Sequence, residues 1–378
     1  MKTNLLQKNI PKDWSVKKIK DILDFEQPTK YIVESSSYTP TGKTAVLTAN
    51  KSFVLGYTNE TDGIYTNTPA IIFDDFTTDS KYVDFPFKVK SSAIKILTNR
   101  DQNTDLKFVY EIMKSFNFPI ANHKRHYISQ YQELDIIVPS VKEQKSIAEI
   151  LSAVDTKIQI LDSLISKDTD LKKSIITESF NKGSVHKIKD VALINDSQIN
   201  PRNMEGCSYK YIDIGSVKNY RVKDCTDIDN KTAPSRARRL VRENDTLIAT
   251  VRPNLRTLVF IDFDAKKFIA STGFCVLTPN VRIVDPSFLY YITFDENFTK
   301  YLVSKTKGSN YPAVSPQDIG EYSFKVPKLE DQKNIANLLS SIDKRLKIKI
   351  ELKDKMSLLK KGLVSDLLSG KVRTINNK

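Results

Sequence analysis

A long internal repeat dictates the architecture of this chain. Residues 138–155, VPSVKEQKSIAEILSAVD, return as residues 326–343, VPKLEDQKNIANLLSSID, and the two blocks align without a gap. Their offset is about 188 positions, whereas VKKIKDI at 16–22 and VHKIKDV at 185–191 are offset by about 169. A solenoid repeats over a far shorter period, so the sequence predicts two related half-molecules, the second with roughly nineteen extra residues.

The repeated blocks divide the chain into four predicted segments. These are a globular module over residues 1–138, a long helix over 139–183, a second module over 184–326, and a second long helix with a C-terminal tail over 327–378. Both modules mix strand-like runs with helical stretches, so the predicted fold class is α+β. The two modules have different contents between equivalent anchors, which predicts two unlike heads on one shared frame.

Both predicted helices carry an apolar stripe with the alternating four- and three-residue spacing of a coiled coil. The first stripe comprises Ile147, Leu151, Val154, Ile158, Leu161 and Ile165. The second comprises Ile335, Leu339, Ile342, Leu346, Leu352, Leu359 and Leu363, and it ends near Gly370, a residue type favoured just after a helix. A helix of about 39 residues is roughly 58 Å long, so it extends beyond a small domain. We expect the helices to pack on each other, antiparallel, about a pseudo-twofold axis; the alternative is that each stripe packs on its own module.

Composition limits the classes of protein to consider. The chain has 378 residues, enough for two or three domains, and its apolar fraction of 40% is ordinary for a globular protein. No apolar run approaches the roughly 20 residues that span a bilayer, and the N-terminus lacks a signal-peptide core. The three cysteines, Cys207, Cys225 and Cys275, show no C-x-x-C spacing. We therefore expect a cytoplasmic protein without disulfides, a zinc site or a membrane partner.

The charge of the chain points to a polyanionic partner. Lysine and arginine number 59 against 45 acidic residues, which gives a net charge of +14 and a pI near 9.3. Such an excess is typical of proteins that bind nucleic acid. The alternative is a lysine-rich host proteome, which raises the pI of unrelated proteins as well.

These residues together resemble the specificity subunit of a type I DNA restriction–modification system, over almost the whole chain. The most specific parts of the resemblance are the repeated V-P-x-x-x-E/D-Q-K block, the Ser235-Arg236-Ala237-Arg238 stretch and the Arg252-Pro253-Asn254 turn. In that family, two target-recognition domains are separated by long helices, and each domain reads one half of a split DNA sequence. A stiff helix pair would hold two such readers at a fixed distance, as a flexible linker could not.

The resemblance also implies partners and cofactors. It implies double-stranded DNA, two modification (methyltransferase) subunits that dock on the helices, and restriction (translocase and nuclease) subunits. We expect no cofactor on this chain itself; S-adenosylmethionine, ATP and Mg would belong to the partner subunits. We also expect no catalytic residue, since Asn200-Pro201-Arg202 is the nearest approach to a methyltransferase motif and lacks its second proline and aromatic residue.

Candidate DNA contacts follow from residue type, because arginine pairs with guanine and asparagine with adenine, whereas Lys, Ser and Thr mostly hold phosphates. In the second module the leading candidates are Arg236, Arg238, Arg239, Arg252, Asn254 and Arg256. A second group in a polar loop comprises Lys307, Ser309, Asn310 and Tyr311. In the first module the candidates are Lys43, Thr44, Lys51, Thr77, Thr78, Lys81, Lys124 and Arg125. The alternative for all of them is a solvated basic face without base contacts.

Two motifs suggest other sites, and neither is complete. Thr41-Gly42-Lys43-Thr44 ends like a phosphate-binding loop, but Ser37 stands where that loop needs its first glycine. His123 and His126 have no nearby cysteine or acidic set to complete a metal site. The other functions left open are a coiled-coil adaptor whose basic modules bind protein or RNA, and a nuclease.

Overall fold

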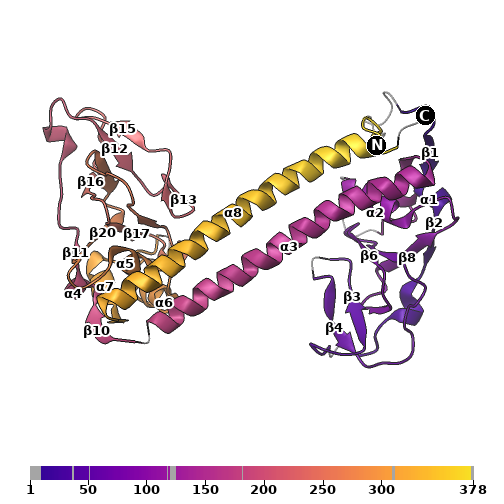
Figure 1. Ribbon diagram of the computed structural model, residues 1–378, viewed down its shortest axis with the longest axis horizontal. Helices are drawn as coiled ribbons and strands as arrows, with labels where there is room; N and C mark the ends of the chain where they lie inside the picture. The colour runs from indigo at the N-terminus through magenta and orange to yellow at the C-terminus, as the bar shows by residue number, and fades with distance from the viewer. Residues whose placement is uncertain are drawn as a thin grey trace. The chain divides into compact units, whose positions relative to one another are not determined.

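A computed structural model describes residues 10–375, apart from residues 36–37, 51, 117, 120–124, 181 and 309–310. The chain forms two compact units, the first from Met1–Leu161 with Leu352–Lys378 and the second from Asp162–Glu351. Helices α3 (Val141–Ser179) and α8 (Leu329–Leu368) each contribute one part to each unit (Figure 1). The compact units therefore cut across the four segments named from the sequence.

Besides its parts of α3 and α8, the first unit carries three small sheets and helix α2 (Leu106–Ser115). Its sheets have the strand orders β1-β9, β2-β8-β5-β6 and β4-β3-β7. The strands are β1 (Ser15–Lys18), β2 (Leu23–Glu26), β3 (Thr44–Leu47), β4 (Val54–Thr58), β5 (Ala70–Asp74), β6 (Ser80–Val83), β7 (Phe87–Val89), β8 (Ile94–Asn99) and β9 (Asp135–Val138). The short helices are α1 (Ile19–Ile22), η1 (Pro28–Tyr31) and η2 (Tyr131–Glu133).

The second unit repeats this plan with additions. Its sheets have the orders β10-β21, β11-β20-β17-β18, β15-β12-β19-β16 and β13-β14. The strands are β10 (Ser184–Lys187), β11 (Ala192–Ile194), β12 (Tyr209–Ile212), β13 (Val217–Lys218), β14 (Arg221–Val222), β15 (Thr226–Ile228), β16 (Ala237–Leu240), β17 (Thr246–Ala249), β18 (Leu258–Phe260), β19 (Phe268–Ser271), β20 (Phe274–Pro279) and β21 (Ser323–Val326). The helices are α4 (Ile188–Val191), η3 (Pro201–Asn203), η4 (Pro253–Leu255), α5 (Pro286–Ile292), α6 (Glu296–Lys305) and α7 (Pro316–Gly320).

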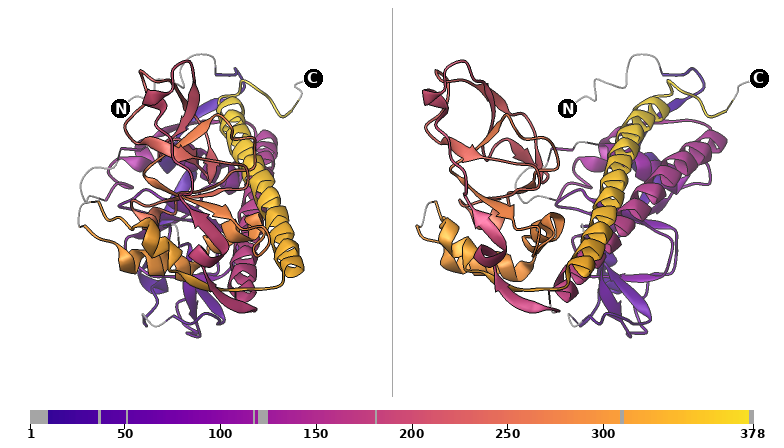
Figure 2. Two further views of the ribbon diagram at one scale, coloured as in Figure 1. Left: turned by 90° about the vertical axis from the view of Figure 1, so that its left-hand side faces the viewer. Right: turned by 60° about the vertical axis from the view of Figure 1, so that its left-hand side comes forward.

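The extra length of the second unit lies in elements that the described part of the first unit does not have. Hairpin β13–β14 and strand β16 are added between β12 and β17, and helix α6 is added after α5. Figure 2 shows the orange helices of this unit gathered beside the start of α8, with the rose-coloured strands β12 to β16 at the other end. The parallel pairing of β12 with β19 matches that of β3 with β7, so the shared sheet survives the additions.

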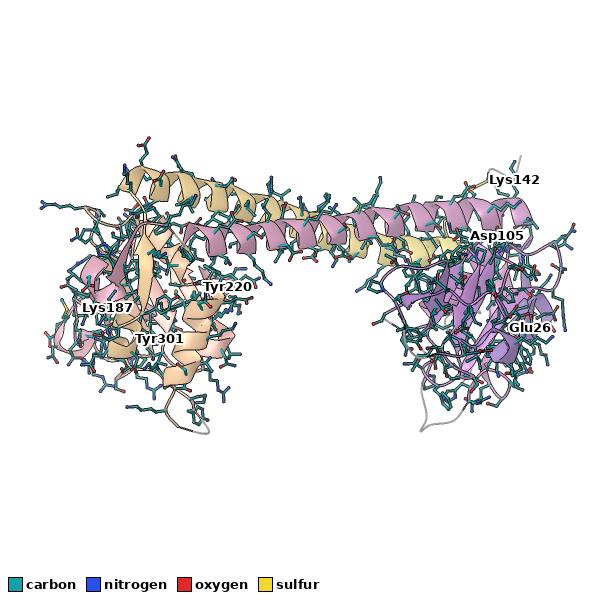
Figure 3. All side chains as sticks on the ribbon, turned by 90° about the horizontal axis from the view of Figure 1, so that it is seen from below. Glu26, Asp105, Lys142, Lys187, Tyr220 and Tyr301 are labelled. Carbon is teal, nitrogen blue, oxygen red and sulfur yellow. The ribbon has the colours of Figure 1, made fainter. Side chains whose placement is uncertain are left out.

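The glutamine of each repeated block makes the same hydrogen bonds in both units. Gln144 accepts a hydrogen bond from the Asp105 N–H at 2.7 Å and donates to the carbonyl of Pro139. Gln332 does the same with Asp285, at 2.8 Å, and Pro327. Both side chains are fully buried. Asp105, labelled in Figure 3, and Asp285 are the N-caps of α2 and α5, so each glutamine joins the start of a long helix to the start of a module helix.

The long helices pack antiparallel within each unit, as predicted. In the first unit Asp155 of α3 contacts Lys360 of α8 at 2.5 Å. In the second unit Asp343 of α8 contacts Lys172 of α3 at 2.6 Å. Asp155 and Asp343 are equivalent in the repeat, and so are Lys172 and Lys360. The ion pairs are therefore exchanged between the helices, which confirms the predicted pseudo-twofold relation.

The two packing alternatives considered for the apolar stripes both occur. Ile147 and Leu151 of α3 lie in one buried cluster with Phe108 of α2 and with Leu367 of α8. Ala336 and Leu339 of α8 likewise join Phe288 of α5 in the second unit. The start of each stripe thus packs on its own module as well as beside the other helix.

The later part of the second stripe was predicted incorrectly. Leu352 and Leu359 are about half exposed, at 46% and 50%, instead of lying in the seam. The less exposed positions of α8 in this stretch include Lys349, Met356 and Lys360. Lysine fits there because its aliphatic stem packs while its ammonium reaches a carboxylate on α3, Asp168 for Lys349 and Asp155 for Lys360. Gly370 has the positive φ of 72° expected after a helix end.

The N- and C-terminal segments meet inside the first unit. Arg373 contacts Glu143 at 2.7 Å and also pairs with Asp13. Trp14 donates its indole N–H to the same Glu143 at 3.1 Å, and the Arg373 guanidinium lies over its ring. We call these four residues the terminal cluster. In the second unit the corresponding connection, from α3 to β10, is continuous chain.

Two further observations concern the described residues only. Their helices include none with the length and apolarity needed to cross a membrane. Their His, Cys, Asp and Glu side chains form no group of three or more suited to holding a metal ion.

Candidate nucleic-acid interface

The same turn-and-loop arrangement occurs at one place in each unit. In the first, the chain leaves β5 at Asp75, whose N–H donates to the Ala93 carbonyl and whose carbonyl accepts from the His126 N–H. In the second, it leaves β17 at Thr250, whose N–H donates to the Gly273 carbonyl and whose carbonyl accepts from the Val314 N–H. We call the turn after each strand, with the loop that docks on it, the turn–loop surface.

The second unit's turn has an unusual backbone. Arg252 and Arg256 flank the short helix η4, and both adopt the left-handed conformation with φ of 50°. Non-glycine residues rarely take this conformation, and where they do they often lie at functional sites. The Arg252 N–H donates to the Pro312 carbonyl at 2.7 Å, which fixes the turn to the loop. Asn254 is exposed at the tip of the turn.

The structure brings two separately predicted groups of residues together here. The Arg252 guanidinium lies over the ring of Tyr311, 5.4 Å from its centroid. Lys307 is exposed on the same loop, and its backbone forms an antiparallel bridge with Ala313 at the other side of the loop. Arg252, Asn254, Arg256, Lys307 and Tyr311 therefore belong to one turn–loop surface. Ser309 and Asn310 lie outside the described residues.

The basic segment beside this surface divides into outward and inward arginines. Arg236 is exposed, and its carbonyl accepts from Thr272, the neighbour of Gly273, so it borders the turn–loop surface. Arg238 is half-buried and donates its Nε to the Ser235 carbonyl.

Arg239 is half-buried and its Nε atom is buried, so its DNA contact stays a prediction with less support than that of Arg236. Burial raises the pKa of the Cys275 thiol to about 12, and the nearby Arg239 charge opposes that rise. The register of β16 shifts between Ala237 and Arg239, and Arg239 pairs with the buried Ala270, so its guanidinium is less available to DNA than that of exposed Arg236.

The first unit's turn is held by a buried ion pair. Lys95 Nζ lies 3.4 Å from the Asp75 carboxylate, and both side chains are almost fully buried. The other Asp75 oxygen accepts from the Tyr127 N–H at 2.8 Å. Gln27 accepts a further hydrogen bond from Lys95. Since Tyr127 belongs to the docking loop, Asp75 joins the turn to that loop through its side chain as well as its backbone.

The predicted residues of the first unit's turn are less exposed than expected. Thr77, Thr78 and Lys81 are half-buried, and Thr78 has a positive φ of 58°. The Asp74 carboxylate accepts from the Phe76 and Thr77 N–H groups, both at 2.9 Å. Exposed Arg125 lies on the docking loop, with its guanidinium 5.9 Å from the centroid of the Phe76 ring.

The remaining predicted residues of the first unit lie elsewhere. Lys43 is exposed just before β3, in the sheet that does not contain β5. Thr44 is a correction, because it is 5% exposed and forms the first residue of β3, where its side chain is unavailable to a duplex. Lys51 and Lys124 lie outside the described residues.

Sequence reasoning missed residues that matter to both surfaces. Phe76 and Leu255 are exposed apolar residues on the two turns, and Asp75 with Lys95 fixes the first turn. The structural equivalence of β5 and β17 places Phe76 beside the residue that matches Arg252, but the two strand sequences are too unlike to mark that equivalence. No sequence signal marks Lys95 as the buried partner of Asp75, since lysine is rarely buried.

Comparisons with known proteins agree on one family. The family model described as "Type I restriction modification DNA specificity domain" matches residues 11–167 and 182–357. A type I restriction enzyme specificity subunit from Escherichia coli is 44% identical over 156 residues, which cover 40% of this chain and 38% of that protein. One from Methanocaldococcus jannaschii is 24% identical over 405 residues, covering 97% of this chain and 95% of that protein.

A solved structure supports the fold. The type I restriction–modification S subunit from M. genitalium aligns with a TM-score of 0.65 and 18% identity, over 96% of this chain and 97% of that chain. At that level of identity, the likeness concerns the fold.

Proposed function

This chain belongs to the family of type I restriction–modification DNA specificity domains. From that premise, we propose that it reads a bipartite DNA sequence. The carrying observation is the pair of equivalent turn–loop surfaces with unlike side chains. A target of two different half-sites needs two readers on one frame, and each unit supplies one. The net charge of +14 favours a polyanion for both.

We assign specificity to this chain and chemistry to its partners. Methylation and cleavage would be carried out by modification and restriction subunits, which would bring S-adenosylmethionine, ATP and Mg. We propose a cytoplasmic location, where a DNA ligand and the partner subunits would be within reach. This division of labour leaves the chain free to vary its reading residues without disturbing a catalytic centre.

The long helices offer equivalent docking sites for two copies of a modification subunit. Apolar side chains more than a third exposed occur in matched pairs on α3 and α8, at Ile150 and Leu338, Ile160 and Ile348, Leu164 and Leu352, and Leu171 and Leu359. Exposed apolar residues that recur in both repeats fit a partner that binds twice. Two identical partners on two equivalent sites agree with the exchanged ion pairs of the helices.

The test is selection from random duplexes by the full chain assembled with its modification subunits. The wild-type complex should enrich a gapped motif with two fixed halves. Arg252→Ala should relax the half read by the second unit, by about 1–3 kcal/mol of discrimination, and leave the other half unchanged. Arg282→Ala, an exposed arginine away from the turn, is the matched control. Equal loss at both halves would contradict the assignment of one half-site to each unit, and no enrichment at all would favour the adaptor.

A further inference from the structure

An arginine is held against an aromatic ring on the turn–loop surface of each unit, with the contributors exchanged. In the second unit the turn supplies the cation, Arg252, and the loop supplies the ring of Tyr311. In the first unit the turn supplies the ring of Phe76, and the loop supplies the cation, Arg125. Both guanidinium-to-centroid distances, 5.4 and 5.9 Å, lie within the range of a cation–π contact.

In the first unit, Arg125 differs from the other arginines by what it does not contact. The first unit contains three arginines, Arg100, Arg125 and Arg373. Arg100 pairs with Asp24, and Arg373 pairs with Asp13 and Glu143. Arg125 has no acceptor for its guanidinium among the described residues, and the same holds for Arg252. Their N–H groups are therefore available to a ligand.

Neighbouring backbone and side-chain contacts fix the position of each arginine–aromatic pair on its turn–loop surface. Tyr311 is 72% exposed, and among the described residues its ring contacts only Arg252 in this way. The left-handed backbone of Arg252 and its N–H bond to Pro312 position the cation on the turn. In the first unit, the hydrogen bonds of His126 and Tyr127 to Asp75 position the loop that carries Arg125.

Because neither guanidinium has an acceptor among the described residues, its edge is free, and this favours a planar ligand with two acceptors side by side. Stacking uses the flat face of the group, whereas hydrogen bonds leave from its edge in a rigid fork. In the major groove of DNA, guanine presents O6 and N7 as such a pair, and arginine is its usual partner. A phosphate could also accept the fork, but it would carry no sequence information.

We propose that Arg252 and Arg125 each read a guanine, one in each half-site, and that Tyr311 and Phe76 are positioning residues that hold them. The proposal rests on the proposed function and adds the base that each unit reads. The ring limits the directions that the guanidinium can take. Binding to the correct base is therefore strengthened more than binding to an incorrect base.

The experiment compares conservative variants in the assembled complex by selection from random duplexes. Arg252→Lys keeps the charge and loses the fork, so discrimination at one guanine should fall about 5- to 150-fold. Tyr311→Ala should relax the same position to a smaller extent, and Tyr311→Phe, which keeps the ring, should resemble the wild type. Arg125→Lys and Phe76→Ala should act on a guanine of the other half. Arg282→Lys is the matched control for loss of an exposed guanidinium.

Each other outcome has a defined meaning. If Arg252→Lys and Tyr311→Ala weaken binding to all duplexes equally, the pair holds phosphate and the proposal is wrong. It is also wrong if the relaxed position is not a guanine, or if Tyr311→Phe is as harmful as Tyr311→Ala. Failure of the wild-type complex to select a gapped motif would instead overturn the proposed function. A selected motif that these variants leave unchanged would overturn this inference alone.

Discussion

The two units keep the same frame and differ in the exposed side chains of their turn–loop surfaces. Gln144 and Gln332 make matching hydrogen bonds to the N-caps Asp105 and Asp285. The turns leave β5 and β17 through matching backbone hydrogen bonds, although Asp75 has become Thr250 in the second copy. Backbone bonds do not depend on side-chain identity, so a surface held by them can change its chemistry and keep its shape.

The two units also differ in the interactions that stabilise them. The first unit fixes its turn with the buried pair Asp75–Lys95 and joins its chain ends through the terminal cluster. In the second unit, continuous chain from α3 to β10 stands where the first unit has the terminal cluster. This unit also adds strand β16 beside its turn–loop surface. Equivalent architecture is thus stabilised by different interactions, which predicts that the units will respond differently to matched substitutions.

The largest expected effect tests the shared frame. Gln144→Leu and Gln332→Leu should each cost about 3 kcal/mol, because each leaves a buried N–H and carbonyls without partners. Trp14, the only tryptophan, lies in the first unit, so its fluorescence follows unfolding there. Gln144→Leu should move that transition, whereas Gln332→Leu should move only the circular-dichroism transition of the second unit. A common shift in both signals would mean that the units unfold together.

The terminal cluster should matter to one unit only. Arg373→Met should destabilise the first unit by about 2 kcal/mol, because Glu143 is fully buried and would lose its charge partner. Adding Glu143→Gln should recover part of the loss, since no buried charge then remains. The measurement is denaturant unfolding followed by Trp14 fluorescence. An unchanged midpoint for Arg373→Met would show that the cluster contributes nothing to stability.

The exchanged ion pairs predict a pH dependence. Burial would raise the pKa of Asp155, but hydrogen bonds from Lys114 and Lys360 outweigh it and hold the pKa below its usual value. The stabilisation is therefore complete above the unfolded value of about 3.9 and disappears as the pH falls through the lower folded value. Asp155→Asn should cost about 1–2 kcal/mol at pH 7, and the gap from the wild type should close in strong acid. A gap that persists at pH 2 would contradict this origin.

The smallest expected effect concerns a cluster without a counterpart. Asp168 binds Arg345 and Lys349 in the second unit, whereas the repeat places Met356 at the equivalent position. Asp168→Met should change the free energy of unfolding by less than about 1 kcal/mol, because methionine packs in the same stripe, exposed Arg345 remains solvated, and the flexible Lys349 stem can turn its ammonium to solvent. The measurement is denaturant unfolding followed by circular dichroism. A loss above about 2 kcal/mol would make this cluster a determinant of the second unit.

The repeat made much of the fold predictable, because a gapless match over two separated blocks leaves few architectures. The long helices, their antiparallel packing and the paired modules all followed from it. Prediction failed for Leu352 and Leu359, which are exposed, since the seam instead runs past Lys349 and Lys360. Hydrophobic spacing cannot show that a lysine will lie in a seam when its partner, Asp155 or Asp168, is distant in sequence.

The candidate interface was predictable in part for a similar reason. Residue type identified Arg252 and Tyr311, but only the fold brings them into contact. Thr44 and Arg239 were selected as polar residues in suitable segments, yet all four residues of β3 are buried, and the Nε atom of Arg239 is buried as well. Pairing across a sheet and docking of a loop depend on contacts distant in sequence, and a local pattern does not contain them.

Because each long helix contributes residues to both units, the order of synthesis affects the order in which the units can fold. A ribosome releases the first module early, yet that unit needs Leu352–Lys378, which is synthesised only after the whole of the second unit. The second unit, Asp162–Glu351, has all its residues before those final ones emerge. The order in which the units can complete their folding is therefore opposite to the order of synthesis. The first unit begins to be synthesised first, but it is complete only after the second unit, when Arg373 reaches Glu143.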